Sequence, residues 1–156
     1  FEILGRLPCR NGSAILVDDY AHHPREVSAT LDAARACWPS QDLLVVFQPH
    51  RYSRTRDLFD DFVELLASET RLLVCEVYPA GETPIAGADG LSLCHAIRSR
   101  GRVDPVFVEN VFDLPELLPP LLRPDDVLLT LGAGNIGRVA RGLIGTLNGR
   151  PAGTDE

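Results

Sequence analysis

The stretch DVLLTLGAGNIG, residues 126–137, joins an apolar run to a glycine-rich turn. The run is short and lacks polar alternation, which predicts a strand buried on both faces. Apolar residues then recur at helical spacing, at Ile136, Val139, Ala140 and Leu143. A buried strand that passes directly into a helix is the repeating unit of an α/β fold.

Four further units of this kind precede the opening stretch. Their apolar runs cover residues 13–20, 43–49, 71–78 and 103–110, and each is followed by a segment of helical spacing. Five units in succession predict a parallel sheet with helices on both faces, and residues 1–7 are a candidate for an added edge strand. We therefore expect a Rossmann-like three-layer α/β/α sandwich with a mostly parallel sheet of five to six strands.

Composition narrows the class of partner. The formal net charge is −7, which argues against nucleic acid or an anionic membrane surface as a partner. All 15 basic residues are arginine, so this chain has no lysine for a P-loop or a Schiff base. The apolar runs are too short to span a bilayer. We expect one domain and no membrane or nucleic-acid partner.

The sequence also lacks methionine and lacks cysteines at metal-binding spacing. No Met is present, so Phe1 is not a natural translation start, and we expect this chain to be a piece of a larger protein. The four cysteines show no metal-binding spacing, which predicts small buried side chains in a reducing compartment and no metal site.

The first polar cluster is VDDYAHHPREV, residues 17–27. Ligands of such folds bind at the carboxyl ends of the strands, which is where this segment begins. Pro24 suits the first helical position, with His23 or its neighbour as the helix cap. The crevice would then receive Asp18, Asp19, Tyr20, His22 and His23. For the histidines, a helix cap beside a solvated ring is the alternative interpretation. A magnesium-holding receiver domain would need a lysine, which this chain lacks.

The second polar cluster is FQPHRYSRTRDLFDDF, residues 47–62. Its arginines Arg51, Arg54 and Arg56 lie at a strand-to-helix turn, where guanidinium groups can bind a carboxylate or a phosphate. A solvated turn, with the arginines paired to aspartates of the following helix, is an equally good interpretation.

The glycine turn GAGNIG, residues 132–137, satisfies the dinucleotide pattern G-x-G-x-x-G. It lies in the last unit rather than the first, and no acidic residue follows about 20 positions later except in the terminal tail. Both observations count against NAD, and close helix–strand packing at a tight turn is the favoured interpretation of the glycines. A stand-alone dinucleotide-binding module and a pure interaction domain remain alternative functions.

Five motifs in this order carry a resemblance to a known family: VDDYAHHP, VFQPHRYSRTRDLFDDF, YPAGETPI, GAD and LLTLGAGNIG. Together they resemble the C-terminal domain of the Mur ligases of bacterial peptidoglycan synthesis, most of all the alanine-adding branch. The resemblance covers residues 1–147, and residues 148–156 are expected to form a disordered tail. The family's N-terminal UDP-sugar domain and central ATPase domain are not in this chain, which we expect to be inactive alone.

The resemblance implies a function and a set of site residues. It implies an ATP-dependent cytoplasmic ligase that joins L-alanine to UDP-N-acetylmuramate, with ATP and Mg²⁺ bound mainly by the central domain. The partners implied are these two substrates and the other two domains. Asp19 matches the residue that approaches the ATP ribose, and no catalytic or metal-binding residue is implied here. The substrate-binding positions implied are Tyr20, His22, His23, Arg51, Arg54, Gly134 and Asn135.

Overall fold

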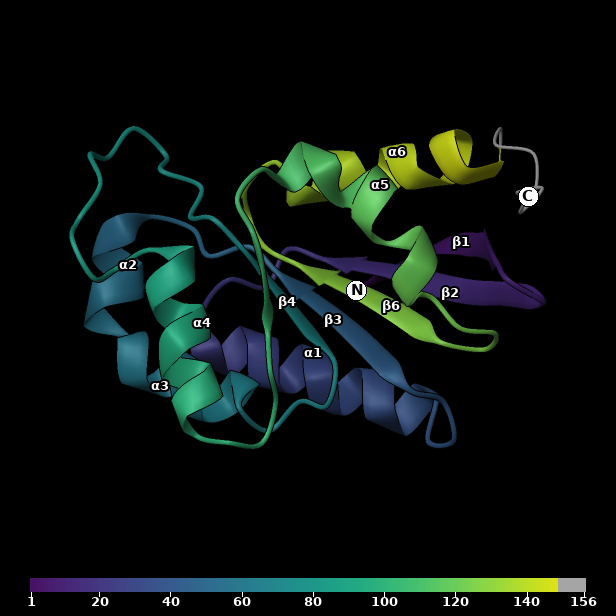
Figure 1. Cartoon of the computed structure of the whole chain (residues 1–156), viewed down its shortest axis with the longest axis horizontal. Helices are drawn as coiled ribbons and strands as arrows, with labels where there is room; N and C mark the ends of the chain where they lie inside the picture. Colours follow the sequence, from purple (N-terminus) through teal and green to yellow (C-terminus); the bar gives the residue numbers. More distant parts are fainter. Residues whose placement is uncertain (149–156) are drawn as a thin grey trace.

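The computed structural model describes residues 1–148, and these form a single sheet flanked by helices (Figure 1). The strands are β1 (Glu2–Cys9), β2 (Gly12–Asp19), β3 (Leu43–Phe47), β4 (Leu72–Cys75), β5 (Val106–Val108) and β6 (Val127–Leu131). The helices are α1 (Pro24–Cys37), α2 (Tyr52–Asp57), α3 (Phe59–Leu66), α4 (Gly90–Ser99), α5 (Leu114–Leu117) and α6 (Ile136–Asn148), with short 3₁₀ turns η1 (Val111–Asp113) and η2 (Pro119–Leu121). Asn148 ends α6, so this residue is helical rather than part of the expected disordered tail. The other residues of that expected tail, 149–156, lie outside the described residues.

The sheet has the strand order β1-β2-β6-β3-β4-β5. All neighbouring strands are parallel except β1, which returns antiparallel along β2 through a tight turn at Asn11. The expected fold class is therefore confirmed, and the sheet has the upper of the two expected strand numbers. The run 103–110 gives only three strand residues, because Pro105 lacks the amide hydrogen that would extend the pairing.

Alternating side chains of the buried strands form two cores. Val45 and Phe47 of β3 pack with residues of α1, α3 and α4 on one face of the sheet. Leu44 and Val46 of the same strand pack with residues of α5 and α6 on the other face. Figure 1 shows the helices separated in this way, with α5 and α6 on one side of the sheet and α1, α3 and α4 on the opposite side. The two cores fix the register of β3, and hence which polar residues follow it at the carboxyl edge.

The start of α1 has the predicted form. His23 is the N-cap, Pro24 occupies the first turn, and the Glu26 carboxylate accepts hydrogen bonds from the backbone N–H groups of His22 and His23 at 3.1 Å. This capping box turns the chain sharply from β2 into α1. It holds the segment 18–23 at the carboxyl edge of the sheet.

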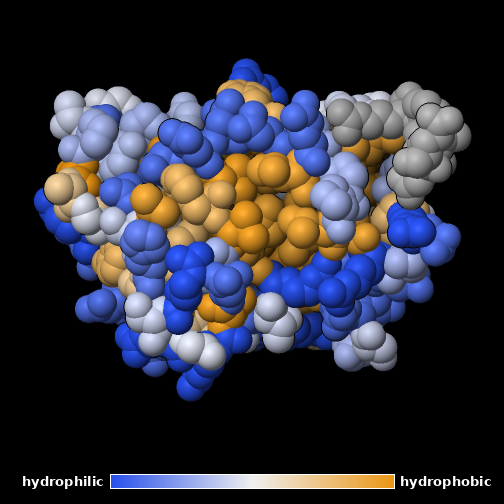
Figure 2. All heavy atoms as spheres, viewed as in Figure 1, coloured by the Kyte–Doolittle hydropathy of each residue, from blue (hydrophilic) through white to orange (hydrophobic). Residues whose placement is uncertain are grey.

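The surface of the described residues is not uniformly polar. Figure 2 shows apolar side chains gathered in the middle of one face, between α4 and α5 of Figure 1. Val106 of the edge strand β5 is 45% exposed. No helix of the described residues is long and apolar enough to cross a membrane.

The cysteines only partly follow expectation. Cys75 and Cys94 are fully buried, and burial raises their pKa values to about 12 and about 11. Cys9 is only partly buried and Cys37 is exposed, which corrects the prediction of four buried side chains. Cys37 closes α1, where the apolar helical face has already ended at Ala34.

The glycine turn between β6 and α6 packs against the end of β3 and the segment after β4. A Cβ on Gly132, whose φ is +152°, would lie 2.8 Å from the carbonyl oxygen of Gln48. A Cβ on Gly134 would lie 2.6 Å from the Gln48 Oε1 atom and 2.6 Å from Cβ of Tyr78. Close approach of two chain segments therefore accounts for both glycines.

This packing makes a prediction for stability. Gly134→Ala places a methyl group into the contact with Tyr78 and should lower the free energy of unfolding by about 1–3 kcal/mol. Gly142→Ala is the matched control, because it lies inside α6 with open space around it and should stabilise by about 0.5–1 kcal/mol. Urea unfolding of both variants measures the difference. Equal stability of the two would show that the turn is not tightly packed.

Candidate functional site

A row of four rings runs across the carboxyl edge of the sheet. Tyr20 contacts His22 edge-on at 5.4 Å between ring centroids, His22 lies 5.7 Å from His50, and Tyr78 stacks on His50 at 5.4 Å. These residues follow β2, β3 and β4, so the sheet order brings together segments that lie far apart in the sequence. Tyr20 at one end is 70% exposed, which leaves the row open to a ligand.

His50 is held in its neutral form. Burial lowers its pKa below the ordinary value of 6.5, and the neighbouring positive charge of Arg54 lowers it further. Arg54 Nη1 lies 3.3 Å from His50 Nδ1 and donates to the His50 carbonyl oxygen at 3.2 Å. Because a guanidinium group can only donate, Nδ1 carries the lone pair and Nε2 carries the proton. The imidazole thus orients Arg54 while adding no charge to the site.

Arg51 reaches the crevice from an unusual backbone conformation. Its φ is +73° and its ψ is 130°, values that a side-chain-bearing residue rarely adopts. Three hydrogen bonds hold its backbone there. Its N–H donates to the carbonyl oxygen of Tyr78 at 2.8 Å, and its carbonyl oxygen accepts from the Thr55 hydroxyl at 2.9 Å and the Thr55 N–H at 3.1 Å. Strained residues of this kind cluster at ligand sites. The Arg51 side chain is 48% exposed and therefore accessible to a ligand.

Glu82 anchors the loop 79–88 beside Arg51. Its carboxylate accepts hydrogen bonds from the Ser53 N–H at 2.9 Å and the Ser53 hydroxyl at 2.6 Å. These bonds hold the pKa of Glu82 below its usual value, so the side chain is ionised at neutral pH. Arg51 Nη1 lies 3.7 Å from the same carboxylate, which is an ion pair without a close hydrogen bond. Arg51 is thereby positioned, and its other donors make no hydrogen bond within residues 1–148.

The remaining expected site residues lie at the same edge. Asp19 ends β2 and its Oδ1 accepts a hydrogen bond from the Ala21 N–H at 2.8 Å. The His23 ring serves the helix start, with Nδ1 accepting from the Arg25 N–H at 3.4 Å. The helix-cap interpretation therefore describes His23, whereas His22 faces His50. Gly134 and Asn135 lie in the turn beside Gln48 and Tyr78.

Asp18 has a structural place instead. It is buried, its Oδ1 accepts from the Thr130 hydroxyl at 2.7 Å, and its Oδ2 lies 3.6 Å from Arg141 of α6. Burial raises its pKa, with Thr130 and Arg141 acting in the opposite direction. It ties β2 to α6 from inside the fold.

Four residues that shape the crevice were not among the expected site residues: Gln48, His50, Tyr78 and Glu82. Tyr78 and Glu82 were within the motif YPAGETPI. Gln48 and His50 were within the quoted arginine motif, and their place at the end of a buried strand was the available signal. Glu82 lies 29 residues from Ser53, and no local pattern connects the two. Of the three arginines, only Arg56 shows the expected pairing with a following aspartate, Asp57.

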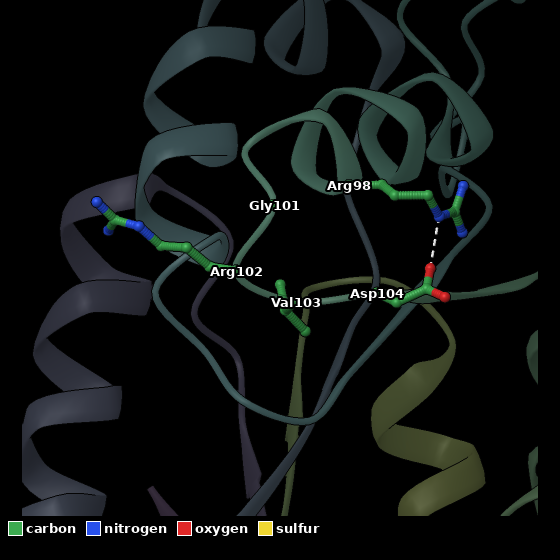
Figure 3. A pocket seen from close by; sticks show the side chains of 5 residues that line it. All are labelled: Arg98, Gly101, Arg102, Val103 and Asp104. Carbon is green, nitrogen blue, oxygen red and sulfur yellow. Dashed lines mark hydrogen bonds and ion pairs between the residues drawn. The ribbon is translucent and has the colours of Figure 1, made fainter.

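The hollows of the described surface include two that differ in size and place. The larger, about 280 Å³, lies at the opposite, amino-terminal edge of the sheet and is lined by residues 98 and 101–104. Figure 3 shows Arg98 and Arg102 pointing away from one another there, with Arg98 paired to Asp104. The smaller, about 150 Å³, lies at the carboxyl edge and is lined in part by Gln48, Tyr78 and Asn135. Only the smaller one adjoins the row of rings.

A metal site is not built by this part of the chain. Within residues 1–148, no group of three or more His, Cys, Asp or Glu side chains has the arrangement to hold an ion. At the start of α6, the Ile136 N–H is not free for a dinucleotide phosphate, because it donates to Gln48 Oε1 at 3.0 Å. The glycine turn thus serves packing against Gln48.

The fold and the site define an α/β domain with arginine and histidine side chains converging at the carboxyl edge of a parallel sheet. Residues 1–134 match the family described as "Mur ligase, glutamate ligase domain". The chain belongs to this family.

Solved structures agree with this assignment. A UDP-N-acetylmuramate-alanine ligase, MurC, from Thermotoga maritima matches with a TM-score of 0.66 and 26% identity, over 85% of this chain and 26% of that one. A domain from a putative UDP-N-acetylmuramate:L-alanyl-γ-D-glutamyl-meso-diaminopimelate ligase of Haemophilus ducreyi 35000HP matches with a TM-score of 0.64 and 22% identity, over 94% of this chain and 98% of that one. A murein peptide ligase of Psychrobacter arcticus 273-4 matches with a TM-score of 0.67 and 16% identity, over 96% and 30%. The chain therefore spans about a quarter of the T. maritima ligase, and the last two matches support the fold alone.

The electrostatics of His50 can be measured directly. We expect its ring to titrate below 6.5, and Arg54→Ala to raise that pKa because a nearby positive charge is removed. Ring resonances of His50 followed by NMR against pH give both values. An unchanged pKa in the variant would mean that Arg54 does not contribute to it.

The anchoring role of Glu82 gives a further prediction. Glu82→Ala should speed amide hydrogen exchange in the loop 79–88 and at the Ser53 N–H, because both ends of that contact are released. Glu64→Ala, a change of an exposed glutamate on α3, is the matched control and should leave both regions unaltered. Loop exchange that is equally fast in the unsubstituted chain would contradict the anchoring.

Proposed function

We propose that this chain is the amino-acid-binding C-terminal domain of an ATP-dependent ligase that joins L-alanine to UDP-N-acetylmuramate. The observation that carries the proposal is the placement of Arg51 and Arg54 beside His50 and His22 in an otherwise acidic protein. A cationic crevice beside the neutral imidazole of His50 suits a small carboxylate ligand. The resemblance to the alanine-adding branch gives the proposed identity of that ligand.

The proposed reaction has two chemical steps. The γ-phosphoryl group of ATP passes to the lactyl carboxylate of UDP-N-acetylmuramate, which yields an acyl phosphate and ADP. The amine of L-alanine then attacks the acyl carbon, and the tetrahedral intermediate expels phosphate as the amide forms. Mg²⁺ held by the central domain would offset the phosphate charges. The other two domains of the ligase supply the nucleotide sites, and the substrates place the enzyme in the cytoplasm.

This chain contributes positioning. Arg51, held by Glu82 and the Tyr78 carbonyl, binds the alanine carboxylate through its free donors. Arg54, oriented by His50, provides a second cation on the same ligand. Fixing the carboxylate aims the amine at the acyl phosphate, which replaces a bimolecular search with an oriented attack. Asp19 at the end of β2 faces the ATP ribose in this assignment, and the domain alone is inactive.

A substitution tests the assignment in the full-length ligase. Arg51→Ala should raise the KM for L-alanine by about tenfold to a hundredfold, because a hydrogen-bonded charge is removed from the ligand. The KM for ATP should change far less. Arg56→Ala is the matched control, since Arg56 lies on the same helix but pairs with Asp57 outside the row. Equal rises for both substrates would remove the assigned role of Arg51.

A further inference from the structure

The small cavity at the carboxyl edge adjoins the proposed alanine site. It measures about 150 Å³ and includes Gln48, Glu76, Tyr78, Glu109, Asn110 and Asn135 in its lining. Tyr78 also stacks on His50, so one ring borders both the cavity and the row. The volume is below that of sites for whole ligands, which suits a single polar group of a larger substrate.

The orientation of Gln48 follows from its partners. Its Oε1 lies 3.0 Å from the backbone nitrogen of Ile136, which can only donate a hydrogen bond. The oxygen of the Gln48 amide must therefore face the start of α6. Its Nε2 then faces Asn135, at 2.7 Å from Oδ1. Gln48 is 4% exposed, so water is not available to satisfy the reversed orientation.

The hydrogen bond from Gln48 also fixes the orientation of the Asn135 side-chain amide. Because Gln48 Nε2 donates to it, the oxygen of the Asn135 amide faces Gln48 and the NH₂ group is left over. Among residues 1–148, the Nδ2 atom makes no hydrogen bond, and Asn135 lines the cavity. Asn135 is thus set to donate a hydrogen bond to an oxygen acceptor of a ligand.

The charges around the cavity select the kind of acceptor. Glu76 and Glu109 line it as well, and Glu76 is already tied to the start of α4 through the Gly90 N–H at 3.0 Å. Two carboxylates in the lining disfavour an anionic oxygen. They favour a group that also donates hydrogen bonds, which hydroxyl and secondary amide groups do.

We propose that this cavity binds a neutral hydroxyl- or amide-bearing part of the UDP-sugar substrate, and that Gln48 is the positioning residue that makes Asn135 its donor. The assignment rests on the proposed ligase function. Of the three substrates, L-alanine carries no neutral polar group. ATP is assigned to Asp19, which is not in the lining of this cavity. UDP-N-acetylmuramate carries both sugar hydroxyls and an N-acetyl amide.

Two isosteric substitutions test the proposal in the full-length ligase. Asn135→Asp replaces the donor by an acceptor directly. Gln48→Glu does so indirectly, because the new carboxylate accepts from Ile136 and also requires Asn135 to turn its NH₂ group inward. Each should raise the KM for UDP-N-acetylmuramate by about threefold to tenfold, the effect of losing one hydrogen bond. The KM values for L-alanine and ATP should stay within about twofold.

A spectroscopic readout separates positioning from a general structural effect. In this chain, the side-chain NH₂ protons of Asn135, assigned by their loss in Asn135→Asp, should exchange faster with water than those of Gln48. In Gln48→Glu they should become protected, because they then donate to the buried carboxylate. Gln41→Glu adds the same charge in the loop after α1, away from the cavity, and should change neither readout.

Contrary outcomes are distinguishable. Unchanged KM for UDP-N-acetylmuramate in Asn135→Asp overturns the cavity assignment, even where Arg51→Ala still weakens alanine binding. A loss in Asn135→Asp without a loss or NMR change in Gln48→Glu overturns the role of Gln48. If Gln48→Glu fails to fold, Asn135→Asp and the exchange of the Asn135 protons in the unsubstituted chain still decide the question.

Discussion

The buried amide of Gln48 joins the end of β3 to the start of α6, and the shape of the crevice depends on it. The backbone carbonyl oxygen of Gln48 fills the space that a side chain at position 132 would need, and the Gln48 side chain fills the space at position 134. Those glycines allow the turn to approach β3 and Tyr78 closely. Tyr78 in turn stacks on His50 and accepts the N–H of Arg51. One side-chain amide thus links the glycine turn to the row of rings and to the strained arginine.

Charge is arranged unevenly around this centre. The chain is acidic overall, yet Arg51 and Arg54 face the crevice with their charges only partly offset. Glu82 lies beside Arg51, and both oxygens of the Glu82 carboxylate already accept hydrogen bonds from Ser53. On the cavity side of Tyr78, the side chains of Glu76 and Glu109 bring negative rather than positive charge to the surface. The surface on one side of Tyr78 therefore suits an anionic group of a ligand, and the cavity on the other side suits a neutral group that donates hydrogen bonds.

Much of the fold could be predicted from the sequence. The apolar runs located the strands, and the pattern His23-Pro24 with Glu26 located the start of α1. The limits appeared where long-range contacts decide. The length of β5 depended on Pro105 and on its edge position. The partner of Arg51 was Glu82 rather than a nearby aspartate, because the loop 79–88 folds back onto α2. His50 and Tyr78 lay within quoted motifs but were not expected to bind a ligand, and their importance came from stacking across neighbouring strands.

The sequence by itself determined the α/β class, the location of the polar segments at the carboxyl ends of the strands, and the family. Local periodicity and turn chemistry are properties of short segments, so they can be recognised without knowing which segments pack against them. Only the tertiary structure decided that β6 inserts between β2 and β3, which brings the glycine turn beside Gln48 and the histidines of two loops together. It also decided the direction of the Asn135 amide. Both depend on hydrogen bonds between residues more than eighty positions apart, and no spacing along the chain encodes such bonds.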